Sequence, residues 1–416
     1  MKGNTAKSFF PIGIVAGILL GVVIGSIHPE TGIRIGILGR LFLNALKMIA
    51  LPLIVISITL SVLSLGHTKT LGSLTVKTLT YYLITTSIAV LIGIILVTVI
   101  EPGKGGKTQI KDIPQAIFEK REIGISDVIL SFIPSNIVEA ALGFQILPLI
   151  FVSILFGTAL ATLGKESAII TQILEVLNKA LMKIVEWIIL FTPVGILGLI
   201  SERIGLEGGG DAVLKLALSL GKYVGTVLLG LAIHGFIVLP VILLLVARYN
   251  PVLYASKLGK ALITAFVTAS SSATLPLTMK GAIEEAHVSP EVGRFVLPLG
   301  ATINMDGTAL YEAVAVIFIA QSYGIQFGIV ELIIVFFTST LAAIGAAGIP
   351  EAGLVTMVLV LEAVGLPTEG IGLILTVDWL LDRFRTVVNV WGDCVGAAII
   401  DRKHKGTTCL QITGEE

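Results

Sequence analysis

Long apolar runs recur along the chain and constrain its fold more than any other feature of the sequence. Six of them fall in the first 250 residues, at 9–27, 33–64, 70–99, 129–164, 168–200 and 212–248. About 20 apolar residues let a helix cross a bilayer, so each run predicts a membrane span, and the longer ones are expected to be tilted. Because backbone polar groups in lipid must be satisfied internally, the runs predict an all-α polytopic membrane protein.

Composition agrees with this class of protein. Charged residues make up 13% of the chain and mean hydropathy is +0.99, whereas a soluble chain carries about 25% charged residues. The formal net charge is zero, so nothing indicates nucleic-acid binding. Cys394 and Cys409 are expected to be free thiols, and the five histidines show no spacing for a transition metal.

We expect a multi-pass protein of the plasma membrane, and the basic residues between the runs favour an orientation with both termini in the cytoplasm. The loop 101–127 is also basic, although this orientation places it outside. The first run follows Lys2 and Lys7 and lacks a small-residue cleavage site. We therefore expect an uncleaved first span.

Two apolar segments after residue 250 are interrupted in the middle. Segment 255–285 breaks at TASSSATLP, residues 268–276, and segment 327–363 breaks at AIGAAGIPEAG, residues 343–353. Proline removes a backbone donor and clashes with the preceding turn, so neither segment can run on as one straight helix. Each is long enough for two half-helices and a tip, which predicts a re-entrant hairpin. A kinked ordinary span is the alternative for either one alone.

Each predicted hairpin precedes a helix that carries polar residues, at 292–321 and 367–402. This repeat of hairpin and helix is typical of the binding site of a transporter. Together with the six earlier spans, it predicts eight transmembrane helices plus two re-entrant helical hairpins. We divide the chain into six spans at 1–250, a transport core at 251–402 and a cytoplasmic tail at 403–416.

The last predicted helix carries a polar stripe. At about 100° per residue, one face roughly 100° wide holds six polar side chains, and Arg383 lies off it. The six are Asp378, Asp382, Arg385, Thr386, Asn389 and Asp393. A charge at the bilayer centre costs at least a few kcal/mol, so the stripe must face protein, water or a polar ligand. A buried ion-pair network that only holds helices together is the alternative.

The stripe has the chemistry to hold an acidic amino acid. Arg385 offers a bidentate fork to a carboxylate, and Asp382 could hold an ammonium group. Thr308, Asn389 and the hairpin tips would add a polar cradle. A C4-dicarboxylate is the alternative substrate, but it has no amine and would leave Asp382 unpaired.

Oxygen donors beside the stripe favour a hard cation such as Na⁺. They come from side chains and from carbonyls freed at glycine interruptions, namely Asn304, Asp306, Asn389, Asp393, Gly300 and Gly307. Glu312 lies eight residues after Asn304, and a carboxyl group in an apolar core can pick up a proton. A Glu312 permanently bonded to a neighbouring hydroxyl is the alternative. The hydroxyls of Tyr82, Thr85 and Thr86 could equally bond the preceding helix turn.

These motifs make the chain resemble the dicarboxylate/amino acid:cation symporter family, the sodium-coupled glutamate and aspartate transporters. The resemblance covers essentially the whole chain. The residues that carry it are SSSATLP at 270–276, PLGATINMDGTALYE at 298–312, AIGAAGIPEAG at 343–353 and DRFRTVVNVWGD at 382–393.

The resemblance implies a homotrimer of inverted-repeat elevator transporters embedded in lipid. A transport core would carry the substrate across the membrane against a static trimerisation scaffold, mainly 1–64 and 129–204. The spans 70–99 and 212–248 would flank the core. The second hairpin, 327–363, would be the extracellular gate.

The resemblance also implies the substrate contacts. Asp382 would bind the amino group and Arg385 the side-chain carboxylate. Further contacts would come from Ser271, Thr308, Thr386, Asn389 and backbone at Ile349 and Gly353. Arg385 argues against a neutral amino acid transporter, where the matching position is usually not basic.

Three sodium sites follow from the same resemblance. The first would use Gly300, Asn304, Asn389 and Asp393. The second would use Thr302, Met305, Ala343, Ile344 and Ala346. The third would use Tyr82, Thr85, Thr86, Asn304 and Asp306. In animal members the glutamate matching Glu312 is linked to H⁺ cotransport and K⁺ countertransport, which makes both ions further candidates for coupling.

The sequence departs from the family pattern in places. Archaeal members tend to carry an arginine directly before the serine tip, where this chain has Ala269, and the extra arginine here is Arg383. Glu351, inside the second tip, has no assigned role. An anion channel is the alternative from another class of function. An enzyme is disfavoured because Asp306 and Asp393 lack a nucleophile–base pair.

Overall fold

The computed structural model describes residues 3–66, 72–104, 133–143, 146–206, 210–345 and 352–404. Over these ranges the chain is helical and contains no strand, which confirms the predicted all-helical class. Four helices in the described ranges are long and apolar enough to cross a membrane: Pro29–Leu60, Leu74–Ile100, Leu218–Ala247 and Pro290–Ser322. A bent pair, Gly164–Ile189 with Thr192–Leu206, forms a fifth candidate.

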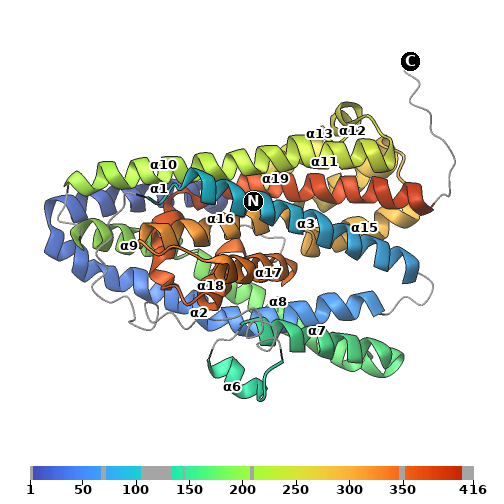
Figure 1. Cartoon of the computed structure of the whole chain (residues 1–416), viewed down its shortest axis with the longest axis horizontal. Coiled ribbons are helices and arrows are strands. Elements are labelled where there is room, and N and C mark those ends of the chain that lie inside the picture. Colours follow the sequence, from blue (N-terminus) through green and yellow to red (C-terminus); the bar gives the residue numbers. More distant parts are fainter. Residues whose placement is uncertain are drawn as a thin grey trace.

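The first half of the chain packs long helices closely. Helix α2 (Pro29–Gly66) lies against α1 (Gly3–Ile27), α7 (Ile146–Thr162) and α9 (Thr192–Leu206) (Figure 1). A methyl group added at Gly198 of α9 would lie 2.5 Å from the backbone nitrogen of Gly39 on α2. Small residues at a helix crossing let backbones approach in this way, as is typical of membrane helices.

Two predicted runs are divided in the structure. The run 129–164 forms α6 (Ile137–Leu142), whose N-terminus is capped by the Asn136 side chain, and then α7. The run 168–200 forms α8 (Ala168–Ile189) and α9, which meet at an angle of 52°. Local apolar content hides such bends, because helix ends depend on caps and tertiary packing.

The run 212–248 continues as one rod with two π-helical segments. It comprises α10 (Gly210–Ile233), η2 (His234–Val238), α11 (Leu239–Ile242) and η3 (Leu243–Ala247). It ends where Arg248 adopts a left-handed φ of 55°. Single π turns inside α-helices often occur at functional sites.

Both interrupted segments form helix pairs. After α12 (Pro251–Lys257), α13 (Gly259–Thr268) and α14 (Ser271–Lys280) meet at Ala269, which has φ 49°. Helices α17 (Ile329–Gly345) and α18 (Ala352–Ala363) pack against each other. The second tip itself falls largely outside the described residues.

The first tip is shorter than the sequence indicated. Ser270 caps α14 by accepting a hydrogen bond from the backbone of Ala273 at 3.1 Å, and the helix then continues through Pro276. The expectation that the break extends to Pro276 is wrong. The left-handed residue and the serine cap already turn the chain, and the proline removes only one backbone donor from the helix that follows.

The polar helices lie at the centre of the molecule. Helices α15 (Pro290–Ile303) and α16 (Asp306–Ser322) are separated at Asn304 and Met305, and all of α16 except Gln321 is buried. The short segment η4 (Gly281–Glu285) precedes α15, and η5 (Thr368–Gly370) precedes α19. Helix α19 (Ile371–His404) runs unbroken along the polar stripe. Helices α3 (Gly72–Ile100) and α10 both pack against α16 and α19 (Figure 1).

Candidate functional site

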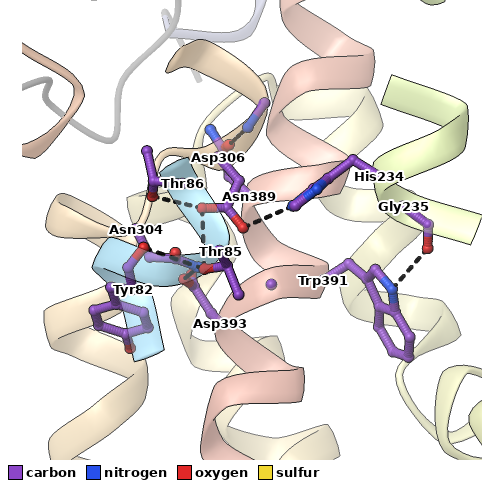
Figure 2. Close-up of polar contacts among 12 residues, drawn as sticks. Tyr82, Thr85, Thr86, His234, Gly235, Asn304, Asp306, Asn389, Trp391 and Asp393 are labelled. Carbon is purple, nitrogen blue, oxygen red and sulfur yellow. Dashed lines mark hydrogen bonds and ion pairs between the residues drawn. The ribbon is translucent and has the colours of Figure 1, made fainter. Parts of the chain in front are cut away.

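The first carboxylate of the site belongs to Asp306, at the start of α16. Its Oδ1 accepts hydrogen bonds from Thr86 at 2.7 Å and from Thr85 at 3.3 Å, both on α3. Its Oδ2 lies 3.0 Å from Nε2 of His234. Figure 2 shows Asp306 between the two threonines and the histidine. Three helices that are distant in sequence therefore meet at one fully buried carboxylate.

The second carboxylate belongs to Asp393 on α19. The Asn304 side chain donates to Asp393 Oδ1 at 2.9 Å, and a methyl group added at Gly300 would collide with the same oxygen. Asn304 Oδ1 is buried and has no hydrogen-bond partner among the described residues. The hydroxyl of Tyr82 donates to the carbonyl of Val296 at 2.8 Å.

Asn389 joins the break between α15 and α16 to the stripe of α19. Its Oδ1 accepts from the backbone N–H of Gly307 at 2.8 Å. Its amide nitrogen donates to the Thr308 hydroxyl at 3.2 Å and to the Met305 sulfur at 3.2 Å. The backbone N–H of Gly307, which is freed where the helix is interrupted, is therefore hydrogen-bonded by the stripe, as buried polar groups require.

These contacts leave a cluster suited to a desolvated cation. Asp306 and Asp393 are buried, and neither is paired with a lysine or arginine in the described ranges. An unpaired buried charge is costly, so a bound cation would stabilise both. The described residues contain no group of three or more His, Cys, Asp or Glu side chains that could hold a metal ion. Amide, hydroxyl and backbone oxygens would have to complete the ligand set.

Arg385 is the charged centre of the stripe and is fully buried. Its Nη2 donates to Asp382 Oδ1 at 2.7 Å, and its Nη1 lies 3.0 Å from Asp378 Oδ1. The guanidinium carbon stands 3.8 Å from the centre of the Tyr311 ring. A methyl group added at Gly353 would lie 3.2 Å from Arg385 Nη1, so the start of α18 approaches the guanidinium closely.

Glu312 lies on α16 and is fully buried. Its Oε1 accepts a short hydrogen bond from the hydroxyl of Thr356 on α18. Its Oε2 has no hydrogen-bond partner in the part of the chain that the structure describes. Thr356 therefore supplies the hydroxyl that a permanently bonded Glu312 requires, and Oε2 of Glu312 remains available to a proton.

Some predicted ligands are not brought into this cluster. The Thr302 side chain is exposed and its hydroxyl donates to the Leu299 carbonyl at 3.0 Å. Helix α17 packs against α15, but no hydrogen bond in the described ranges joins Ala343 or Ile344 to Thr302. Ala346 and Ile349 lie outside the described residues.

Two further substrate candidates have local roles in the structure. The Thr386 hydroxyl donates to the Asp382 carbonyl at 2.8 Å within α19. Ser271 is buried at the first turn of α14. Arg383, predicted to lie off the stripe, donates instead to the carbonyls of Phe266 and Val267 at 3.1 and 2.8 Å, at the end of α13.

Sequence reasoning missed three residues that the structure brings to the site. Tyr311 stacks on Arg385, and Thr356 bonds Glu312. Neither stands out in an apolar helix. His234 does carry a signal, because it is the single ionisable residue in the apolar stretch 224–247, and such residues are functional candidates by default.

Comparison with known proteins identifies the family of the chain. Residues 10–403 match the model of the sodium:dicarboxylate symporter family. The chain is 39% identical to mouse excitatory amino acid transporter 3 over 94% of its own length and 84% of the relative. It is 38% identical to human excitatory amino acid transporter 3, covering 97% and 86% of the two chains.

A third relative is excitatory amino acid transporter 1 of Ambystoma tigrinum, which is 37% identical. That match covers 96% of this chain and 83% of the relative. The resemblance stated from the motifs is therefore confirmed, and with it the prediction of sodium-coupled symport. The chain belongs to the sodium:dicarboxylate symporter family.

Proposed function

We propose that this chain is a secondary active symporter that takes up acidic amino acids, aspartate or glutamate, together with Na⁺. The observation that carries the proposal is Arg385, a fully buried cation beside Asp382 and about two helix turns from Asp393 on the same helix. The printed names of the relatives, excitatory amino acid transporters, support the same substrate class.

Binding of the substrate would replace the ion pair between Arg385 and Asp382 with ion pairs to the substrate. Its side-chain carboxylate would take up the guanidinium fork, and its ammonium group would take up Asp382. The close approach of Gly353 supports a contact with backbone at the start of α18. The Thr308 hydroxyl and the Asn389 amide nitrogen lie 3.2 Å apart. They would complete the polar cradle together with Ser271, Thr386 and Ile349.

Sodium would bind at the two carboxylates. Asp393, Asn304 and Asn389 with the Gly300 carbonyl would form one site, and the unpartnered Asn304 Oδ1 supports it. Asp306 with Tyr82, Thr85, Thr86 and Asn304 would form another. A further site at Thr302, Met305, Ala343, Ile344 and Ala346 rests on the resemblance.

The mechanism would be an elevator movement of the core 251–402. The helix pairs α13–α14 and α17–α18 would be the two re-entrant hairpins, and eight helices would span the membrane. Large apolar side chains such as Phe236 and Leu245, which are 83% and 71% exposed in the single chain, would face lipid or a neighbouring subunit of a homotrimer. Both termini would lie in the cytoplasm, and the protein in the plasma membrane.

Glu312 would carry a proton with the substrate, and K⁺ countertransport is a further possibility for the return step. The support is a fully buried carboxyl group with one unpartnered oxygen, next to the α18 hydroxyl of Thr356. Opening of α18 would break that contact, so protonation could be coupled to gating.

The test is uptake of labelled aspartate into proteoliposomes, with sodium, proton and potassium gradients imposed one at a time. Accumulation driven by a sodium gradient supports the proposal. Current without accumulation would instead favour an anion channel. Competition by succinate as strong as that by aspartate would favour a C4-dicarboxylate, because succinate lacks the ammonium group that Asp382 is proposed to bind.

A further inference from the structure

His234 occupies an unusual place in the site. It begins the π-helical segment η2, where the N–H of Leu239 bonds the His234 carbonyl across five residues. The indole nitrogen of Trp391 on α19 donates to the carbonyl of Gly235 at 3.0 Å. The wide turn is therefore held against α19 just where the imidazole points at Asp306, as Figure 2 shows.

The hydrogen bonds fix which ring nitrogen carries the proton. Nε2 lies 3.0 Å from Asp306 Oδ2, and both side chains are fully buried. Nδ1 is buried and has no hydrogen-bond partner among the described residues. A ring protonated at Nε2 alone leaves no N–H unsatisfied, whereas a proton on Nδ1 would bury an unpaired donor. The imidazole thus donates through Nε2 to the carboxylate.

The two oxygens of Asp306 have different surroundings as a result. Oδ2 is occupied by the histidine, and Oδ1 faces the hydroxyls of Thr85 and Thr86. Carboxylates that bind metal ions are commonly oriented by hydrogen bonds of this kind from a second residue. A freely rotating carboxylate would lose this arrangement each time the ion leaves.

We infer that His234 is a positioning residue for the proposed sodium site at Asp306. Its Nε2–H holds Oδ2 and keeps Oδ1 with the two threonine hydroxyls for the ion. This inference rests on the proposed sodium coupling and assigns to the histidine an effect on sodium affinity, with no direct contact to the amino acid. The π turn and the Trp391 contact set the position of the ring.

The experiment measures thermal unfolding of the purified full-length protein during a NaCl titration without amino acid, with choline chloride keeping ionic strength constant. A ligand that binds the native state raises the melting temperature, so the titration midpoint reports sodium affinity. The informative pair is His234→Gln and His234→Asn. Glutamine can place an amide N–H near the Nε2 position, whereas the shorter asparagine cannot reach Asp306. His28→Gln, at an exposed histidine, is the control.

We expect His234→Asn to raise the sodium midpoint about ten-fold, the order of effect of one hydrogen bond to a charged group. His234→Gln should stay within about three-fold of the parent, and His28→Gln should match it. At saturating sodium, the KM for aspartate in proteoliposomes should be unchanged in the histidine variants. Should the asparagine variant not fold, His234→Leu replaces it as the variant without a donor.

Equal midpoints for His234→Gln and His234→Asn would overturn the inference and leave the histidine a packing role. So would a glutamine variant shifted ten-fold or more. Asp306→Asn separates this result from failure of the proposed function. If Asp306→Asn loses part of the stabilisation that sodium gives the parent, the site at Asp306 exists whatever the histidine does, and the remaining stabilisation belongs to the other proposed sodium sites. If sodium fails to stabilise the parent, the sodium coupling itself is refuted.

Discussion

Arg385 Nη1 lies 3.0 Å from Asp378 Oδ1, so the guanidinium expected to hold a substrate carboxylate is partly neutralised by its own helix. Asp378 lies on the polar stripe, and the sequence alone indicates no separate role for it. Neither of its oxygens has an aligned hydrogen bond in the described ranges, so the contact is an ion pair alone. The arrangement satisfies the buried cation while no substrate is bound.

Replacing Asp378→Asn should therefore strengthen binding of acidic substrates. Loss of the competing carboxylate leaves more positive potential for an incoming one, and we expect the KM for aspartate to fall several-fold. The substrate-free protein should be less stable by about 1–3 kcal/mol, because a buried charge loses a partner. Uptake kinetics and thermal unfolding with and without aspartate provide the measurement. A raised KM would mean that Asp378 orients the guanidinium for the substrate.

Replacing Arg385→Cys should abolish uptake of aspartate, because the substrate carboxylate loses the buried guanidinium fork that is proposed to bind it. The neighbouring Arg383→Cys is the matched control, since Arg383 only caps the end of α13 and should retain uptake. Both variants are compared by uptake of labelled aspartate at equal protein content. Unchanged aspartate affinity in Arg385→Cys would remove this arginine from the binding site.

Replacing Asp393→Asn should raise the sodium concentration needed for half-maximal uptake by about ten-fold or more, because the bound cation loses a buried charge at close range. The maximum rate should recover at high sodium if the variant is folded. The measurement is a sodium titration of initial uptake rates at fixed aspartate. An unaltered titration would contradict a sodium site at Asp393.

Replacing Glu312→Gln should make uptake insensitive to an imposed proton gradient while keeping the shape of the side chain. In the parent, an inward proton gradient should raise uptake, and the amide cannot carry the proton. Glu331→Gln at the start of α17 is the control, because an amide oxygen can still accept from the backbone of Gly328. A response to the gradient that survives in Glu312→Gln would assign proton coupling to another residue.

Replacing Gly198→Ala should destabilise the protein without changing the substrate KM. The added methyl would lie 2.5 Å from the Gly39 nitrogen, and overpacking of this kind costs about 1–3 kcal/mol. Gly221→Ala on α10 is the control, since nothing lies within 4 Å of its added methyl. The measurement is the melting temperature of each variant. Equal melting temperatures for Gly198→Ala and Gly221→Ala would contradict a tight α2–α9 crossing.

The sequence by itself determined the class of protein and much of the site. Apolar run length predicts membrane helices, and the helical period places Asp382, Arg385, Asn389 and Asp393 on one face whatever surrounds them. Interruptions between Gly300 and Gly307 and at the serine tip could be read from residue type, because glycine, proline and serine act locally on the backbone. The division of the run 129–164 into α6 and α7 and the 52° bend in the run 168–200 could not be predicted, because an apolar run has the same composition whether its helix is straight or bent.

Only the tertiary structure decided which polar groups meet. His234 and Asp306 are 72 residues apart, and Glu312 and Thr356 are 44 apart, on helices whose relative rotation no local pattern specifies. The same holds for Arg385, whose neighbours on the stripe were predictable but whose contact with Tyr311 was not. Periodicity fixes the angle of a side chain on its own helix, whereas packing of whole helices fixes the partner that it faces.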